Sequence, residues 1–298
     1  MIKRTLKISS RFYVYQKDRF PLIILAISLL PAILSSGAIM SYHPTFIHIG
    51  YALIASIAYL LHIRIIDEHR DFGHDNVHHS TRPVQVGLIS KDELRYVDIL
   101  AVSIFIFTAI STGYMALTVA IIMLGYSYLA EKEFFIGEKI RHHFFSYNAV
   151  NLVQMFLMQV FVYTVFANPF PFNKLIVLHF LFTSIGTIIF EFVRKLKIPG
   201  DDGSGKDTYT WYLGFDRSIY IYQVLLFLNA ALFFLVATTI STHTIILLFF
   251  AFGLAIATIP SILIHKKKKT PLTDQIMQLS FLILYGVFNI AIYFLKIN

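Results

Sequence analysis

The sequence predicts an all-α membrane protein in which nine helices span the bilayer around a central cavity. Hydrophobic residues occupy 57% of the 298 positions and charged residues only 14%, whereas soluble domains average about 25% charged residues. The apolar residues form long runs of the size that a bilayer requires, roughly 20 residues per helix. The acidic and basic residues gather between alternate runs. These observations exclude an ordinary soluble enzyme and indicate one integral-membrane domain over residues 1–298.

Each predicted span is an apolar run that ends at a polar or turn-forming segment. The connections alternate between short, uncharged turns and longer, charged loops. This alternation indicates that every second connection lies on the same membrane face. The predicted spans are residues 20–41, 45–66, 94–111, 114–130, 146–167, 174–194, 217–239, 243–264 and 273–295.

The distribution of lysine and arginine predicts a cytoplasmic N-terminus. With that orientation, all of the 25 Lys and Arg residues except Lys174 and Lys296 fall on the cytoplasmic side, as the positive-inside rule requires. The 17 acidic residues fall on the same side. We therefore expect a prokaryotic inner-membrane protein whose polar chemistry takes place at the cytoplasmic face.

The net charge of +8 follows from this topology and does not indicate a nucleic-acid partner. The basic run Lys266–Lys269 is expected to anchor the topology and to contact anionic membrane lipids. The chain has no cysteine, which excludes disulfides, thiolate nucleophiles and Cys-ligated metals.

The charged segment 64–90 after the second span is the first candidate site. If the helix continues through it, Asp67, Asp71 and Asp75 lie one turn apart on one face, with Glu68 beside them. Carboxylates stacked in this way repel each other unless a cation lies among them. Their oxygen atoms suit Mg²⁺. The alternative is a charged loop that is simply solvated.

The segment 190–214 after the sixth span is the second candidate site, and it mixes both signs of charge. Arginine and lysine next to flexible glycines can enclose a phosphate, and the aspartates could hold a second metal. The alternative is a loop with ordinary basic anchors. Together, the two segments predict a diphosphate bridged by Mg²⁺. The charged residues of this second segment that we assign to the site are Glu191, Arg194, Lys195, Asp201, Asp202 and Lys206.

Amide side chains mark one face of the fifth span. Asn148 and Asn151 are three residues apart, and amides at membrane depth are costly when they face lipid. This face is therefore expected to point into the helix bundle, where the amides either join helices or line a cavity.

In its predicted spans and its two charged segments, the sequence resembles the UbiA superfamily of intramembrane prenyltransferases. The family's first motif, N-D-x-x-D-x-x-x-D, is matched by residues 67–75, with Asp67 in place of Asn and Glu68 in place of the first Asp. The run R-P-x-x-x-G-x-I-S matches residues 82–90. The helix count and orientation also agree, so the resemblance covers nearly the whole chain.

The family's second motif, D-x-x-x-D, is altered in this sequence. Glu191 and Lys195 have its spacing, so one acid is replaced by a base. Asp201 and Asp202 are expected to supply carboxylates from further along the chain. Lysine can also neutralise an oxyanion directly. The change therefore alters the expected number of metals, and the segment is still predicted to bind a diphosphate.

The resemblance implies Mg²⁺-dependent transfer of an isoprenyl group from a polyprenyl diphosphate to an aromatic or lipid-type acceptor. It implies catalytic roles for Asp71, Asp75 and Glu191. The implied metal ligands are Asp67, Glu68, Asp71, Asp75, Asp201 and Asp202, and the implied substrate-binding residues are Arg82, Arg194, Lys195, Lys206, Asn148 and Asn151.

Three other functions remain open at this point. A terpene cyclase and a non-catalytic isoprenoid binder would use the same fold. A cation or small-solute transporter is a different class, because intramembrane acids and amides also mark ion pathways. The sequence indicates neither the acceptor, nor the isoprenoid chain length, nor the oligomeric state.

Overall fold

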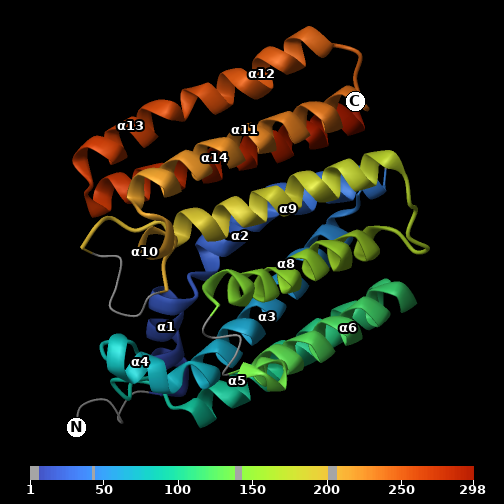
Figure 1. Cartoon of the computed structure of the whole chain (residues 1–298). Coiled ribbons are helices and arrows are strands. Elements are labelled where there is room, and N and C mark those ends of the chain that lie inside the picture. Colours follow the sequence, from blue (N-terminus) through green and yellow to red (C-terminus); the bar gives the residue numbers. More distant parts are fainter. Residues whose placement is uncertain (1–6, 42–43, 138–142, 201–206) are drawn as a thin grey trace. The chain divides into compact units, whose positions relative to one another are not determined.

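The computed structural model describes residues 7–41, 44–137, 143–200 and 207–298, and it contains helices and no strand within them (Figure 1). Within these residues, nine helices are long and apolar enough to cross a membrane, which confirms the predicted all-α, multi-pass architecture. They are Leu22–Met40, Phe46–Arg70, Lys91–Thr112, Tyr114–Glu131, Phe144–Phe166, Lys174–Arg194, Phe215–Thr238, Thr244–Lys268 and Pro271–Ile297.

The chain divides into two compact units, and each is described separately. The first unit comprises residues 1–33 and 45–170, and the second comprises residues 34–44 and 171–298. Helix α2 (Leu22–Met40) contributes to both units. The single domain expected from the sequence stays a prediction.

Among its described residues, the first unit has six further α-helices and a short 3₁₀ helix. Small side chains are buried between its helices, and such side chains let membrane helices approach closely. The fully buried alanines are Ala52, Ala55, Ala109 and Ala120. Its elements are α1 (Ile8–Arg19), α3 (Phe46–Arg70), α4 (Phe72–His78), α5 (Lys91–Thr112), α6 (Tyr114–Glu131), η2 (Glu133–Phe135) and α8 (Phe144–Phe166).

The start of α5 and its connection to α6 follow from local sequence. Ser90 Oγ accepts from the Glu93 amide at 3.2 Å, and Glu93 Oε2 accepts from the Ser90 amide at 2.9 Å. This capping box satisfies two otherwise unpaired N–H groups at the helix start. Gly113 joins α5 to α6 with φ of 127°, a conformation that favours glycine. The turn therefore sends α6 back beside α5.

The second unit has an aromatic core. The rings of Phe233 and Phe288 stack with centroids 4.3 Å apart, and Phe182 lies against both. A buried polar link accompanies this core, because Ser35 Oγ lies 2.7 Å from Asn289 Oδ1 and 3.0 Å from His179 Nε2. The elements are α9 (Lys174–Arg194), α10 (Tyr209–Leu213), α11 (Phe215–Thr238), α12 (Thr244–Ala257), α13 (Ile259–Lys268) and α14 (Pro271–Ile297).

Candidate functional site

The acidic motif of the first unit lies at the junction of α3 and α4. Helix α3 ends at Arg70, α4 begins at Phe72, and Asp71 between them has φ −92° and ψ 6°. The Asp71 amide still donates to the Asp67 carbonyl at 2.9 Å, and the Asp75 amide donates to the Asp71 carbonyl at 2.8 Å. Helical spacing therefore continues across a short break, and the three aspartates follow one another by one turn each.

Arg70 joins two of these aspartates. Its Nη2 donates to Asp67 Oδ1 at 2.7 Å, and its Nε donates to Asp71 Oδ1 at 3.0 Å. The Arg70 side chain is only 5% exposed, and its guanidinium lies 5.2 Å from the ring centroid of Tyr147. Asp67 and Asp71 keep 30% and 33% of their side chains exposed. A buried, stacked cation thus fixes two accessible carboxylates in one place.

Asp75 has a different partner. Its buried carboxylate accepts a hydrogen bond from Arg82 Nη1. Arg82 belongs to the motif that follows the acids, so the two sequence motifs meet through this ion pair. Within the described residues, no group of three or more His, Cys, Asp or Glu side chains is arranged to hold a metal. In this motif, Arg70 and Arg82 provide the counter-charges to the three aspartates.

Glu68 lies in a separate, buried cluster. Its side chain is 0% exposed, and its Oε1 accepts from Arg19 Nε at 2.9 Å and from Arg64 Nη2 at 2.6 Å. Tyr15 is buried next to this cluster, and its burial, reinforced by the Glu68 charge, raises the pKa of its hydroxyl. Glu68 thereby ties α1 to α3. The metal role that the sequence suggested for Glu68 stays a prediction.

Helix α8 contacts Arg70 through Tyr147, and its amide side chains follow Tyr147 along the helix. Asn148 is buried, and its Nδ2 donates to the Phe144 carbonyl at 2.9 Å. Asn151 is partly exposed on the same helix. Further along, Gln154 is buried, and its Oε1 lies 3.5 Å from the Tyr59 hydroxyl of α3. At least one amide of this helix therefore joins helices, and substrate contact by Asn148 and Asn151 stays a prediction.

The altered second motif lies at the end of α9 in the second unit. Glu191 accepts from two cations: Lys195 Nζ lies 3.0 Å from Oε1, and Arg194 Nη2 lies 2.8 Å from Oε2. The Arg194 side chain is 53% exposed and that of Lys195 is 19% exposed. Asp201, Asp202 and Lys206, which the sequence adds to this site, lie outside the described residues.

The chain beyond this motif returns to the end of α9. The Tyr209 amide donates to the Lys195 carbonyl at 3.1 Å, and the Tyr209 ring stacks on Phe192 at 4.3 Å. Thr210 Oγ1 accepts from the Lys197 amide at 2.9 Å and donates to the Lys197 carbonyl at 2.8 Å. Burial, reinforced by the Glu191 charge, raises the pKa of Tyr209 to about 12. Its hydroxyl therefore keeps its proton at neutral pH.

Sequence reasoning missed several residues that organise these sites. Arg64 and Arg70 lie four residues before Glu68 and three after Asp67, so helical spacing alone indicates both pairs. Arg19 and Tyr147 are far from these acids in the sequence, and no local pattern points to them. The same holds for Asp274, whose Oδ2 lies 3.4 Å from Lys197 Nζ.

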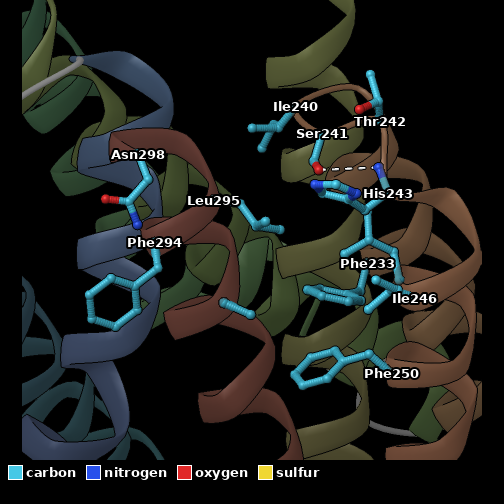
Figure 2. Close-up of a pocket in the computed structure, with 12 residues that line it drawn as sticks. Phe233, Ile240, Ser241, Thr242, His243, Ile246, Phe250, Phe294, Leu295 and Asn298 are labelled. Atoms are coloured by element: carbon cyan, nitrogen blue, oxygen red, sulfur yellow. Dashed lines mark hydrogen bonds between the residues drawn. The ribbon is translucent and has the colours of Figure 1, made fainter.

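A pocket of about 650 Å³ lies elsewhere in the second unit, between the end of α11, the start of α12 and the end of α14 (Figure 2). Its walls include Phe233, Phe250 and Phe294, and at its edge the His243 amide donates to Ser241 Oγ at 3.4 Å. None of the predicted site residues that the structure describes lines this pocket. It is therefore separate from the Glu191 site.

No family model matches the sequence, and no curated protein does so. Solved structures do resemble the chain. A structure of digeranylgeranylglyceryl phosphate synthase is 15% identical, with a TM-score of 0.59 over 97% of this chain and 99% of that one. A UbiA homologue from Aeropyrum pernix K1 is 15% identical, with a TM-score of 0.65 over 89% of this chain and 97% of that one.

A third structure, of a UbiA homologue from Archaeoglobus fulgidus bound to DMAPP and Mg²⁺, is 14% identical. Its TM-score is 0.63 over 95% of this chain and 98% of that one. At these identities the likeness shows the fold. The fold predicted from the two sequence motifs, that of UbiA homologues, is therefore confirmed.

Proposed function

We propose that this protein is a UbiA-type intramembrane prenyltransferase, which transfers an isoprenyl group from a polyprenyl diphosphate to an aromatic or lipid-type acceptor. The observation that carries the proposal is the pair Asp67 and Asp71, which Arg70 holds at the end of a spanning helix. This pair occurs in a chain with the fold of a UbiA homologue that was solved with DMAPP and Mg²⁺.

The residues of the first unit fit Mg²⁺. Proteins usually hold this ion through one or two carboxylates together with substrate phosphates, and not in a cage made wholly of protein ligands. Asp67 and Asp71 supply such a pair of partly exposed carboxylates. Asp75, Glu68, Asp201 and Asp202 remain further candidate ligands. When bound, Mg²⁺ would stabilise the negative charge that develops on a leaving diphosphate.

Arginine and lysine side chains are proposed to bind the diphosphate. Arg194 and Lys195 surround one carboxylate, Glu191, so this group of three side chains carries an excess positive charge. The Arg82 side chain is 25% exposed, and guanidinium groups can bind phosphate oxygens in a bidentate manner. Lys206 remains a further candidate. In this scheme Glu191 orients the two cations toward the phosphate.

The proposed reaction begins with ionisation of the allylic carbon–oxygen bond. The diphosphate leaves with the bonding electron pair, and an acceptor carbon or oxygen then captures the allylic cation and loses a proton. Arg82 stabilises the departing charge, which is commonly the largest contribution to such catalysis, and Arg194 and Lys195 hold the diphosphate before and after ionisation. A cavity closed to water protects the cation from hydrolysis. We propose that this site opens at the cytoplasmic face, where the basic residues gather.

The test is diphosphate release by the purified protein in liposomes. Allylic diphosphates of several chain lengths are supplied with and without candidate acceptors, in Mg²⁺ and in EDTA. Release that requires both Mg²⁺ and an acceptor supports the proposal. Release without an acceptor identifies a cyclase. No release from any allylic diphosphate with any acceptor overturns the proposal and favours a binder or a transporter.

A further inference from the structure

Three polar side chains form a chain of hydrogen bonds across three spanning helices of the first unit. His62 Nδ1 on α3 lies 2.7 Å from Asp98 Oδ1 on α5, and His62 Nε2 lies 2.9 Å from Ser127 Oγ on α6. Ser127 is 1% exposed, and the side chains of His62 and Asp98 are 11% and 23% exposed. The proposed prenyl transfer uses none of them. An ionisable pair within spanning helices is costly and indicates a specific role.

The direction of these hydrogen bonds follows from the number of available protons. Ser127 has one hydroxyl proton, and its Oγ lies 2.9 Å from the Leu124 carbonyl oxygen, which can only accept. We infer that Ser127 donates to Leu124 and accepts at its other side. His62 Nε2 must then carry a proton and donate to Ser127. On the opposite side of the ring, an ionised Asp98 can also only accept.

We propose that His62 and Asp98 form a proton-binding site within the spanning helices of this protein. His62 carries a proton on Nε2, and a second proton is held between Nδ1 and the Asp98 carboxylate. This second proton makes the pair an imidazolium with a carboxylate, or a neutral imidazole with a carboxylic acid. Both forms have zero net charge, which lowers the cost of burial compared with a lone carboxylate.

The described side chains next to the pair on α3, α6 and α8 carry no formal charge. On α3, the Tyr59 ring lies 6.1 Å from the His62 ring, and the Tyr59 hydroxyl donates to the Met123 carbonyl at 3.3 Å. Tyr126 on α6 donates its hydroxyl to the Val150 carbonyl of α8 at 2.9 Å, and α8 adds the neutral amide of Gln154. These described neighbours are uncharged at neutral pH. On these three helices the bound proton is therefore what balances the Asp98 carboxylate, while Arg95, one turn before Asp98 on α5, is exposed.

The order Asp98, His62, Ser127 is also that of a nucleophilic triad, but the proton directions differ. In such a triad the histidine accepts the serine proton and activates the hydroxyl. Here the hydroxyl proton is directed to Leu124, and Nε2 is a donor. Ser127 is moreover almost completely buried. We infer that the three residues bind a proton and join α3, α5 and α6, and that Ser127 is not a nucleophile.

The test is ¹⁵N NMR of protein labelled at its histidine rings, reconstituted in lipid nanodiscs at neutral pH. His62 is assigned from the resonances that His62→Gln removes, or from those that shift in Ser127→Ala if His62→Gln does not fold. The proposal expects a protonated Nε2 on His62. An Nε2 without a proton in the wild-type protein overturns it, because Ser127 would then be the donor. The measurement does not depend on the proposed prenyl transfer.

Two variants sharpen this test. In Ser127→Ala the Nε2 proton is expected to persist, because Asp98 still balances its charge, and the thermal midpoint falls because the N–H loses its acceptor. Ser103→Ala is the matched control, since exposed Ser103 makes a similar bond to the Ile99 carbonyl at 2.7 Å. Ser103→Ala should change neither the protonation of His62 Nε2 nor the thermal midpoint. Labelling of Ser127 by a serine-directed fluorophosphonate would overturn the proposal.

Discussion

Lys195 Nζ lies 3.0 Å from Glu191 Oε1, so the base that replaces an acid of the second motif is paired with the acid that remains. Arg194 binds the same carboxylate, which leaves this group with one excess positive charge. In the first unit, Asp67 and Asp71 share Arg70, which leaves one excess negative charge. This opposite charge supports a division of roles, with a metal at the first group and a phosphate at the second.

Lys195→Ala tests the phosphate role. We expect KM for the allylic diphosphate to rise about 10-fold or more with a smaller change in kcat, because hydrogen bonds to charged groups contribute about 1.5–3 kcal/mol. The measurement is steady-state diphosphate release. Lys132→Ala is the control, since Lys132 is 44% exposed and pairs with Glu131 at the end of α6. An unchanged KM in Lys195→Ala would remove Lys195 from the site.

Asp71→Asn tests the metal role. The substitution keeps the shape of the side chain and removes one of the two accessible charges. We expect turnover to fall by about 10²-fold or more, the scale for losing one preorganised electrostatic group. The concentration of Mg²⁺ needed for half-maximal turnover should rise as well. Asp92→Asn is the control, because Asp92 is exposed at the start of α5. Wild-type turnover that persists in EDTA would contradict the metal mechanism.

Glu68→Gln tests the buried cluster separately from chemistry. The substitution leaves Arg19 and Arg64 without the carboxylate that accepts from both. Breaking a buried ion pair on one side typically destabilises a protein by about 3–5 kcal/mol. We expect a lower thermal midpoint in detergent. Glu131→Gln should leave the midpoint unchanged, because the Glu131–Lys132 pair is exposed. Equal midpoints for the two variants would show that the cluster contributes little.

The length of the apolar runs was enough to predict the spans, since each run has at least 17 residues, the lower end of the range that a bilayer-spanning helix needs. The spacing of four residues also placed Asp67, Asp71 and Asp75 on successive turns. The spacing did not indicate which cation lies among these acids. The sequence predicts a metal there, and the structure places Arg70 and Arg82 beside the acids. The pairing of Arg70 with Asp67 could have been predicted from the same helical spacing, because the two residues are three positions apart. The roles of Arg19, Tyr147 and Asp98 depend on contacts between distant segments, which no local pattern encodes.

Tyr209→Phe is expected to reduce the loss of stability at alkaline pH. Burial raises the pKa of Tyr209 from 10.0 to about 12 in the folded protein. The stability that this shift contributes is fully present below pH 10 and is lost as pH rises from about 10 to 12. Phenylalanine cannot ionise, so the variant should lose less stability across that window in a thermal-midpoint titration. Tyr212→Phe, at a side chain 43% exposed on the same short helix, should behave like wild type.

Single cysteines in this cysteine-free chain test the predicted topology. Thr242 and Lys267 are exposed at opposite ends of the span Thr244–Lys268. Because 23 of the 25 Lys and Arg residues fall on one side in the predicted orientation, the positive-inside rule places that side in the cytoplasm. We expect an impermeant maleimide to label Thr242→Cys in sealed cells and to label Lys267→Cys only after the membrane is opened. The reverse pattern would invert the whole topology and would move the proposed diphosphate site to the outer face.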